Sequence, residues 1–292
     1  MCDNDSLDDM LEYQLRTGGV SRRQFGALTL GAGVVSMLPA VAGAAETKDA
    51  EVEIKTPDGT CDAYFVHPAD GKHPGVLIWP DIFGLRPAFR KMGKRLAESG
   101  YSVLVVNPFY RTKKAPVAAE GASFQDPTVR AALMQLAGTL NKDTADTDAK
   151  TFIAWLDKQS SVDKKKKMGT MGYCMGGPLT MRTAAAIPNR VGAGASFHGG
   201  GLVTDKPDSP HLLVPKMKAS YLFAIAANDD EKQPDAKNVL RETFAKANLP
   251  AEIEVYEGTL HGWCPPDSQV YNEAQAEKAW SRLLALFGKA LA

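Results

Sequence analysis

The chain has 292 residues, of which 44% are hydrophobic and 23% are charged, and its formal net charge at pH 7 is zero. This length and composition are typical of one soluble globular domain with a substantial core. The balanced charge excludes the basic surface that a nucleic-acid-binding protein needs, so we expect no nucleic-acid partner.

The first 44 residues are predicted to be a leader outside the folded domain. Arg22 and Arg23 precede an apolar run at 27–41, and the small residues Ala-Gly-Ala at 42–44 have the character of a cleavage site. The paired arginines resemble a twin-arginine export signal, which implies the export machinery as a partner. The alternative is a membrane anchor, but the run is shorter than the roughly 20 apolar residues that span a bilayer. We therefore expect a mature domain of residues 45–292, without a stable anchor, in a bacterial periplasm or outside the cell.

Apolar strands and amphipathic helices alternate along the rest of the chain. This alternation is typical of an α/β fold with a mostly parallel sheet and helices on both faces. We expect strands at 51–56, 62–67, 76–79, 102–106, 168–173, 193–197, 220–226 and 252–257. We expect helices at 90–98, 127–140, 146–159, 178–186, 235–247 and 273–287.

Four cysteines are present: Cys2, Cys61, Cys174 and Cys264. Cys2 would leave with the leader, and the other three can form at most one disulfide within the chain. In an oxidising compartment at least one thiol would therefore stay free. No pair has Cys-x-x-Cys spacing, which argues against a thioredoxin-like or zinc-ribbon protein.

Residues 172–177 read Gly-Tyr-Cys-Met-Gly-Gly, between an apolar strand and a helix. This is the context of a nucleophile elbow, with Cys174 where serine is more common. Glycine is needed in so tight a turn because side chains would clash, and the N-terminus of the following helix favours a thiolate. The chain contains no Gly-x-Ser-x-Gly motif, so no serine competes with Cys174. The alternative is an inert, buried cysteine in a glycine-rich turn.

A thiol nucleophile needs a base, and in this strand–turn–helix context the acid and the histidine follow the nucleophile along the chain. Asp229 and Asp230 come directly after the predicted strand 220–226, and either could be the acid. His261 lies in the last loop before the terminal helix, where the base belongs. The other histidines have no metal-ligand spacing and are expected to be structural or exposed: His67, His73, His198 and His211.

These motifs, together with the loop Pro80–Gly84, resemble the dienelactone hydrolase family from about Glu51 to the C-terminus. The resemblance implies an α/β-hydrolase fold. It also implies hydrolysis of a small carboxylic ester or lactone through a thioester, with no metal and no organic cofactor.

The resemblance also implies a role for each matching residue. Cys174 attacks the carbonyl carbon, His261 is the general base, and Asp229 orients His261. The backbone amides of Ile82 and Met175 match the oxyanion hole, which agrees with the general rule for this fold.

Two features depart from the family pattern. Asp81 matches a glutamate that contacts and activates the resting thiol, but its side chain is one methylene shorter. Pro265 stands where an arginine would hold the substrate carboxylate. Arg130 matches the family's other carboxylate-binding arginine, and Arg86 and Arg111 are looser candidates. The alternative is that all three are surface arginines. Two tryptophans are expected either to line an apolar pocket or to lie in the core: Trp79 and Trp263.

Two other functions are compatible with this sequence. A binding protein could keep the fold without turnover. A thiol redox protein is the other alternative; the chain lacks a resolving cysteine at motif spacing, but proximity of Cys174 and Cys264 would favour it. For the hydrolase we expect Cys61 and Cys264 to be dispensable for turnover. The oligomeric state is not predicted.

Overall fold

The computed structural model describes residues 38–292. The paired arginines and most of the apolar run of the predicted leader lie outside these residues. Within the described part of the chain, no helix is both long enough and apolar enough to span a membrane.

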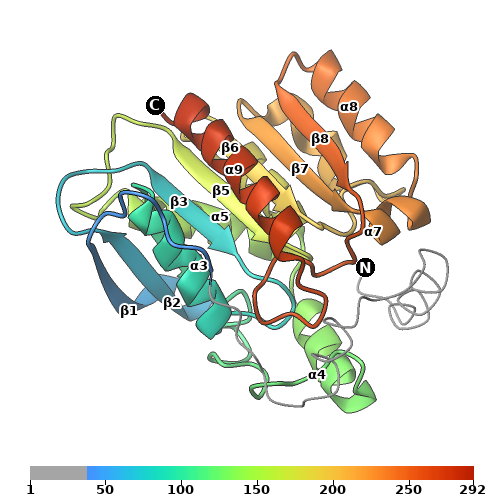
Figure 1. The fold of residues 1–292 in the computed structure, drawn as a ribbon, viewed down its shortest axis with the longest axis horizontal. Helices are drawn as coiled ribbons and strands as arrows, with labels where there is room; N and C mark the ends of the chain where they lie inside the picture. Colours follow the sequence, from blue (N-terminus) through green and yellow to red (C-terminus); the bar gives the residue numbers. More distant parts are fainter. Residues whose placement is uncertain (1–37) are drawn as a thin grey trace.

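The centre of the fold is a sheet of eight strands in the order β1-β2-β4-β3-β5-β6-β7-β8 (Figure 1). β1 pairs with β2, and β2 with β4, in antiparallel orientation. All pairs from β4 to β8 are parallel. The strands are β1 (Thr47–Thr56), β2 (Gly59–Pro68), β3 (Gly75–Trp79), β4 (Ser102–Val106), β5 (Met168–Tyr173), β6 (Val191–Phe197), β7 (Ser220–Ala226) and β8 (Ala251–Tyr256).

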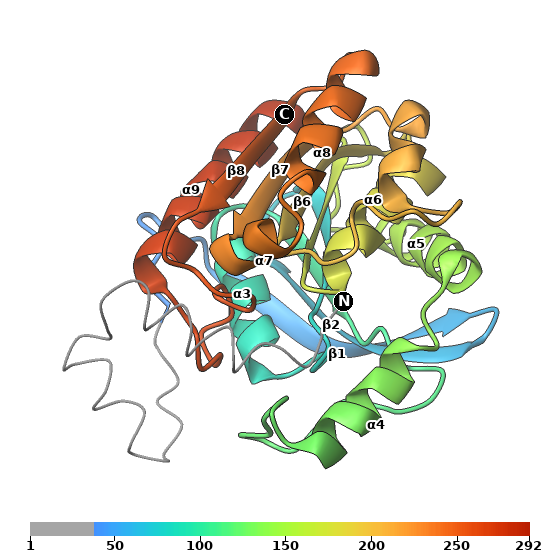
Figure 2. The same ribbon diagram turned by 90° about the vertical axis from the view of Figure 1, so that its right-hand side faces the viewer.

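Helices cover both faces of the sheet, and a separate apolar cluster lies on each face. One cluster contains side chains of α5, α6 and α8, and the other contains side chains of α3 and α9. Figure 2 shows α3 and α9 on one side of the sheet and α5 and α6 on the other. The helices are α3 (Pro87–Glu98), α4 (Pro127–Ala137), α5 (Lys142–Leu156), α6 (Gly176–Ala186), α7 (Ala227–Lys232), α8 (Ala236–Lys246) and α9 (Glu273–Ala290), with a 3-10 helix, η1 (Pro210–Lys216).

The predicted order of elements is confirmed, with shifts at several ends. α5 begins at Lys142 rather than at 146, because Asn141 accepts hydrogen bonds from the amides of Asp143 and Thr144 and so caps the helix. The segment after β7, expected as a loop, is the short helix α7. The 3-10 helix η1 was not predicted, because its two prolines hide any helical pattern.

A third, smaller apolar cluster lies beside α4, which sits at the lower edge of the molecule in Figure 2. Leu133 and Leu136 of α4 pack there with Ile82, and Met175 contacts the cluster from the start of α6. The loop after β3 and the turn after β5 therefore meet beneath α4.

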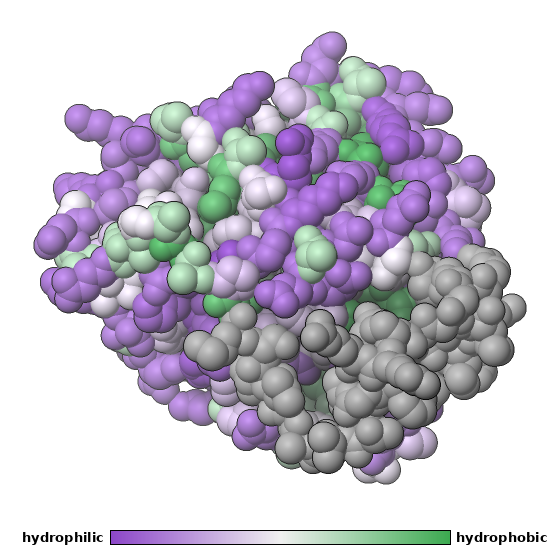
Figure 3. Space-filling model, in the orientation of Figure 1, coloured by the Kyte–Doolittle hydropathy of each residue, from purple (hydrophilic) through white to green (hydrophobic). Residues whose placement is uncertain are grey.

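The face of the molecule in Figure 3 is mostly hydrophilic, with apolar residues in small scattered groups. Among the described residues, the large apolar side chains that are exposed are Met134 and Leu212. Met134 belongs to α4, next to the buried Leu133 in the sequence.

Candidate active site

The turn at Cys174 has the backbone of a nucleophile elbow. Cys174 has φ +52°, a value that side-chain-bearing residues rarely adopt. A Cβ on Gly172 would lie 2.1 Å from the carbonyl oxygen of Gly176, and a Cβ on Gly176 would lie 2.3 Å from that of Trp79. Only glycine fits at these two positions, and strain of this kind is often found at functional sites.

Hydrogen bonds from the neighbouring strands hold this strained turn in place. The Cys174 amide donates to the Phe197 carbonyl at the end of β6 (3.1 Å), and the Gly177 amide donates to the Cys174 carbonyl (3.0 Å). Cys174 is only 5% exposed. The thiol therefore has a fixed position at the first turn of α6, where the helix dipole favours negative charge.

His261 is paired with Asp229. Its Nδ1 lies 2.9 and 2.8 Å from the two carboxylate oxygens of Asp229, and its backbone amide donates to the Asn228 side chain at 2.8 Å. Both side chains are about one-fifth exposed. This contact places the carboxylate on Nδ1 and leaves Nε2 as the ring nitrogen for proton exchange.

Asp230 points to a different partner. Its two oxygens accept hydrogen bonds from Lys237 Nζ at 2.7 and 2.6 Å. Both aspartates lie in α7, so adjacent side chains leave the helix in different directions. Of the two carboxylates, Asp229 is therefore the one that the fold brings to His261.

Asp81 lies in the loop after β3 and is held by Arg86. The guanidinium donates to both carboxylate oxygens at 2.6 and 3.0 Å, and it also pairs with Asp267 at 2.7 Å. These two carboxylates raise the pKa of Arg86 against the opposing effect of burial. Asp81 also accepts from the Phe83 amide, so Asp81 and Arg86 order this loop. A part for Asp81 in thiol activation stays a prediction.

Ile82, next to Asp81, is 4% exposed and packs in the cluster that Met175 also contacts. The loop after β3, which carries Ile82, and the turn after β5, which carries Met175, thus pack against the same cluster. Neither backbone amide donates to an acceptor among the described residues. A backbone amide without an acceptor can donate to the oxygen of a ligand.

Arg111 lies at an internal ion pair. It donates to both oxygens of Asp148, which is fully buried, and to Asp58. Tyr110 also donates to Asp148, at 2.7 Å. The predicted substrate contact of Arg111 is corrected, because its guanidinium is engaged by these carboxylates. Arg86 is committed in the same way.

Arg130 differs from the other two candidates. It is half-buried on α4, and no hydrogen bond or ion pair engages its guanidinium among the described residues. Its neighbour Val129 packs against the cluster that contains Ile82. Arg130 is therefore the arginine of the three that is available to an anionic ligand beside this loop.

The two tryptophans belong to the core. Trp79 is 1% exposed and donates from Nε1 to Thr183 at 3.1 Å. Trp263 is 0% exposed and stacks on Tyr256 with ring centroids 4.9 Å apart. The predicted substrate contact of Trp263 is thus corrected, because a side chain sealed in the core does not face a ligand.

His198, expected to be structural or exposed, is buried beside the site. Its ring centroid lies 5.1 Å from that of His261, in an edge-on arrangement. Burial and the nearby His261 hold the pKa of His198 well below its ordinary value. The position of His198 directly after an apolar strand could have marked it as a residue near the site. No motif spacing connects it to Cys174 or His261, so the sequence did not single it out.

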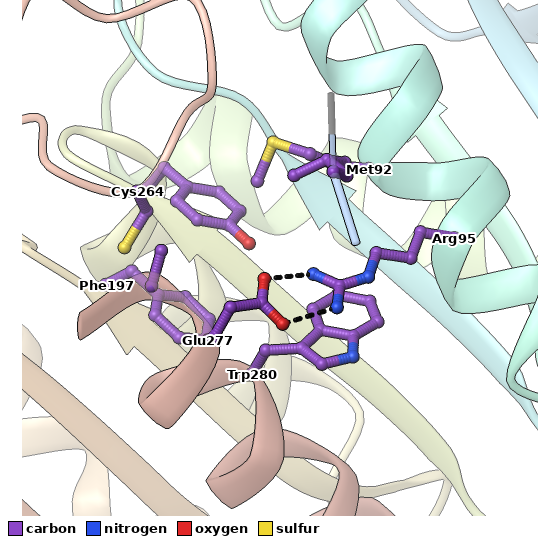
Figure 4. A pocket seen from close by; sticks show the side chains of 9 residues that line it. Met92, Arg95, Phe197, Cys264, Glu277 and Trp280 are labelled. Carbon is purple, nitrogen blue, oxygen red and sulfur yellow. Dashed lines mark hydrogen bonds and ion pairs between the residues drawn. The ribbon is translucent and has the colours of Figure 1, made fainter. Parts of the chain in front are cut away.

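Cys264 lies in a small pocket between α3 and α9, shown in Figure 4. The pocket also contains Tyr173 and Phe197, and Arg95 and Glu277 form a two-bond ion pair across it. Leu38 packs here as well. The three described cysteines are all free and buried, so no disulfide joins Cys174 to Cys264.

Within residues 38–292 there is no group of three or more histidine, cysteine, aspartate or glutamate side chains that could hold a metal ion.

Comparison with known proteins identifies the family. The model of the dienelactone hydrolase family matches residues 61–291. The chain belongs to the dienelactone hydrolase family. A carboxymethylenebutenolidase from Rhodococcus opacus is 28% identical over 244 residues, which cover 81% of this chain and 90% of that protein.

Solved structures agree on the fold of this dienelactone hydrolase family member. A structure from Klebsiella pneumoniae assigned to the dienelactone hydrolases has a TM-score of 0.72 and 24% identity, covering 84% of this chain and 99% of that chain. A dienelactone hydrolase-like promiscuous phosphotriesterase from metagenomic libraries has a TM-score of 0.69 and 19% identity, covering 86% and 100%. The protein is therefore a hydrolase with an α/β-hydrolase fold.

Proposed function

We propose that the protein hydrolyses small carboxylic esters or lactones through a triad of Cys174, His261 and Asp229. The observation that carries this proposal is the pairing of His261 Nδ1 with both oxygens of Asp229, in the loop that follows the last strand. The strained backbone of Cys174 at the start of α6 supplies the matching nucleophile position. The relative from Rhodococcus opacus, a carboxymethylenebutenolidase, supports the substrate class.

Acylation begins when His261 Nε2 takes the proton of Cys174. The thiolate attacks the carbonyl carbon, and the negative charge moves to the carbonyl oxygen, where the amides of Ile82 and Met175 stabilise it. Collapse of this intermediate breaks the bond to the alcohol oxygen. His261 returns its proton to that oxygen, and the acyl group remains on sulfur as a thioester.

Deacylation repeats the sequence with water as the nucleophile. His261 removes a proton from water, and the resulting hydroxide attacks the thioester. The acid is released and the thiolate of Cys174 recovers the proton from His261. Asp229 holds the ring in one tautomer and stabilises its charged form in both halves of the reaction.

The intermediate can be trapped directly. The protein is mixed with a p-nitrophenyl ester or a dienelactone, quenched in acid within one turnover, digested and analysed by mass spectrometry. We expect the acyl mass on the peptide that contains Cys174. Turnover without an adduct there, or with the adduct on another residue, would contradict the thioester mechanism. A folded, reduced protein without turnover on either substrate would favour the binding-protein alternative.

We also propose that Arg130 binds the carboxylate of an anionic substrate. Of the three candidate arginines it is the one without a carboxylate partner among the described residues, and its neighbour Val129 packs against the cluster that contains Ile82. Arg130→Ala should raise KM for a dienelactone about tenfold or more and leave KM for the neutral p-nitrophenyl acetate within about twofold. Arg90→Ala is the matched control, since Arg90 pairs with Glu51 on the surface. Equal effects on the two substrates would remove Arg130 from substrate recognition.

Finally, we propose export through the twin-arginine pathway, with cleavage near residue 44 and a periplasmic or secreted mature enzyme. β1 begins at Thr47, so cleavage would leave the sheet complete, although Leu38 would leave the pocket of Figure 4. Replacement of Arg22 and Arg23 by lysine should retain the full-length chain in the cytoplasm, as measured by cell fractionation and N-terminal sequencing. Export that is unaffected by this replacement would contradict the proposal.

A further inference from the structure

His198 is held in an unusual backbone conformation beside the proposed base. It follows β6 directly and has φ +39°. Its amide donates to the Ala224 carbonyl of β7 at 2.8 Å, while the preceding Phe197 carbonyl accepts from Cys174. A non-glycine residue at positive φ persists only where the surroundings enforce it, and such positions cluster at functional sites.

The side chain of His198 is enclosed by rings. It is 1% exposed, and its ring centroid lies 5.9 Å from Tyr173, 5.1 Å from His261 and 6.3 Å from Trp263. Neither ring nitrogen has a hydrogen-bond partner among the described residues. The ring of His198 is therefore held by the packed rings and by its own backbone, and not by hydrogen bonds to its nitrogens.

The contact with His261 offers a reason for this arrangement. Asp229 holds the Nδ1 side of His261, through two short contacts. His261 is about one-fifth exposed, and a ring packed against its imidazole limits rotation of that imidazole. The ring of His198, fixed by the backbone of β6 and by Tyr173 and Trp263 around it, supplies a rigid surface at an angle of 71° to His261.

The charge state of His198 suits this position. Burial and the proximity of His261 lower the pKa of His198, so its ring is neutral and does not oppose a proton on His261. The other titratable groups with defined contacts to these two rings are Asp229 on α7 and Tyr173 on β5. Burial raises the pKa of Tyr173, so this group is neutral too.

We propose that His198 is a positioning residue, whose buried ring packs against His261 and keeps the His261 imidazole oriented between Asp229 and Cys174. The inference rests on the proposed function, because it assigns His261 as the base. It predicts that the flat ring of His198 matters and that its nitrogens do not.

The test measures the alkylation of Cys174 by iodoacetamide between pH 5 and 10, with mass spectrometry of the Cys174 peptide, beside kcat and KM for a p-nitrophenyl ester. The variants are His198→Ala, His198→Leu and His198→Phe, all in the full chain. Leucine fills most of the volume without a flat ring, so it serves if the alanine variant does not fold. His73→Ala is the control, because His73 lies before β3 and bonds to the Gly100 and Asp70 carbonyls.

In the wild type, alkylation of Cys174 should begin well below the ordinary thiol pKa of about 8.5. His198→Ala and His198→Leu should move its midpoint upward by about one pH unit and lower kcat about tenfold or more, with KM within about twofold. His198→Phe should restore both values, and His73→Ala should match the wild type.

Two outcomes would overturn the inference alone: wild-type profiles in folded His198→Ala or His198→Leu, or a His198→Phe variant as impaired as His198→Ala. A wild-type Cys174 that reacts only with the ordinary thiol profile would instead overturn the proposed function, and the positioning role with it.

Discussion

Cys174 and Cys264 are both buried, yet their backbone conformations and their neighbours differ. Cys174 precedes α6, has a strained backbone and lies in a turn held by β6. Cys264 lies among apolar side chains, as Figure 4 shows, and burial raises its pKa well above the ordinary value. Burial by itself therefore does not make a thiol inert or reactive; the local backbone and the nearby dipoles and charges do.

The sharpest test of this contrast removes each thiol in turn. Cys174→Ala should lower kcat/KM for a p-nitrophenyl ester by at least about 10⁴-fold, because the covalent step is lost. Cys264→Ala and Cys61→Ala should leave it within about threefold, because neither side chain meets the substrate. Steady-state kinetics on folded variants decides the matter. A large loss in Cys264→Ala would mean that Cys264 takes part in turnover, which would contradict the assignment of Cys174 as the sole reacting thiol.

A second test compares the two adjacent carboxylates of α7. Asp229→Asn should lower kcat by about 10²- to 10⁴-fold, since an amide at Nδ1 favours the wrong tautomer of His261. Asp230→Asn should leave kcat nearly unchanged and weaken only the contact with Lys237. Similar losses in both variants would mean that the charge of α7, rather than the contact with His261, is what matters.

A third test measures thiol reactivity in the folded protein. At pH 7.5, iodoacetamide should modify Cys174 at least about 100-fold faster than Cys61 or Cys264, because burial raises the pKa of both other thiols. Peptide mapping by mass spectrometry assigns the label to each cysteine. Labelling of the three cysteines at comparable rates in the native state would contradict the expected difference in thiol reactivity.

The smallest effect concerns stability at high pH. The pKa of Cys264 is higher in the folded than in the unfolded chain, so the folded state retains a proton that the unfolded state loses. This contribution is complete below the ordinary thiol pKa of about 8.5 and declines as pH rises above it, by up to about 1.4 kcal/mol per pH unit. Denaturant unfolding between pH 9 and 10.5 should show a shallower decline in Cys264→Ala. An unchanged slope would mean that Cys264 ionises in the folded state.

Some features of the fold and site were predictable because they depend on local pattern. Gly172 and Gly176 mark the elbow because no other residue fits so tight a turn. The order of Cys174, Asp229 and His261 follows from the sequence of strands, because the carboxyl ends of parallel strands lie on one edge of the sheet. These residues could be named before any distance was known.

Other features depend on contacts between distant segments. The choice between Asp229 and Asp230 is not local, because both residues have the same neighbours in sequence and differ only in what their side chains reach. Residue type and position make Arg111 a candidate for substrate binding, and only its ion pair with Asp148 on α5 removes it from the candidates. The proposed role of His198 depends on three rings that come from β5 and from the loop after β8. No periodic pattern in the sequence predicts that these rings meet.

The sequence by itself determined the order of the elements, the family resemblance, and the candidates for nucleophile and base, because these follow from residue type, strand order and the steric demands of one turn. The tertiary structure decided which carboxylate meets His261, which arginine is available to a ligand, and which rings surround the base. These depend on the direction in which each side chain leaves its element and on packing across the sheet, and neither is encoded by neighbours in the chain.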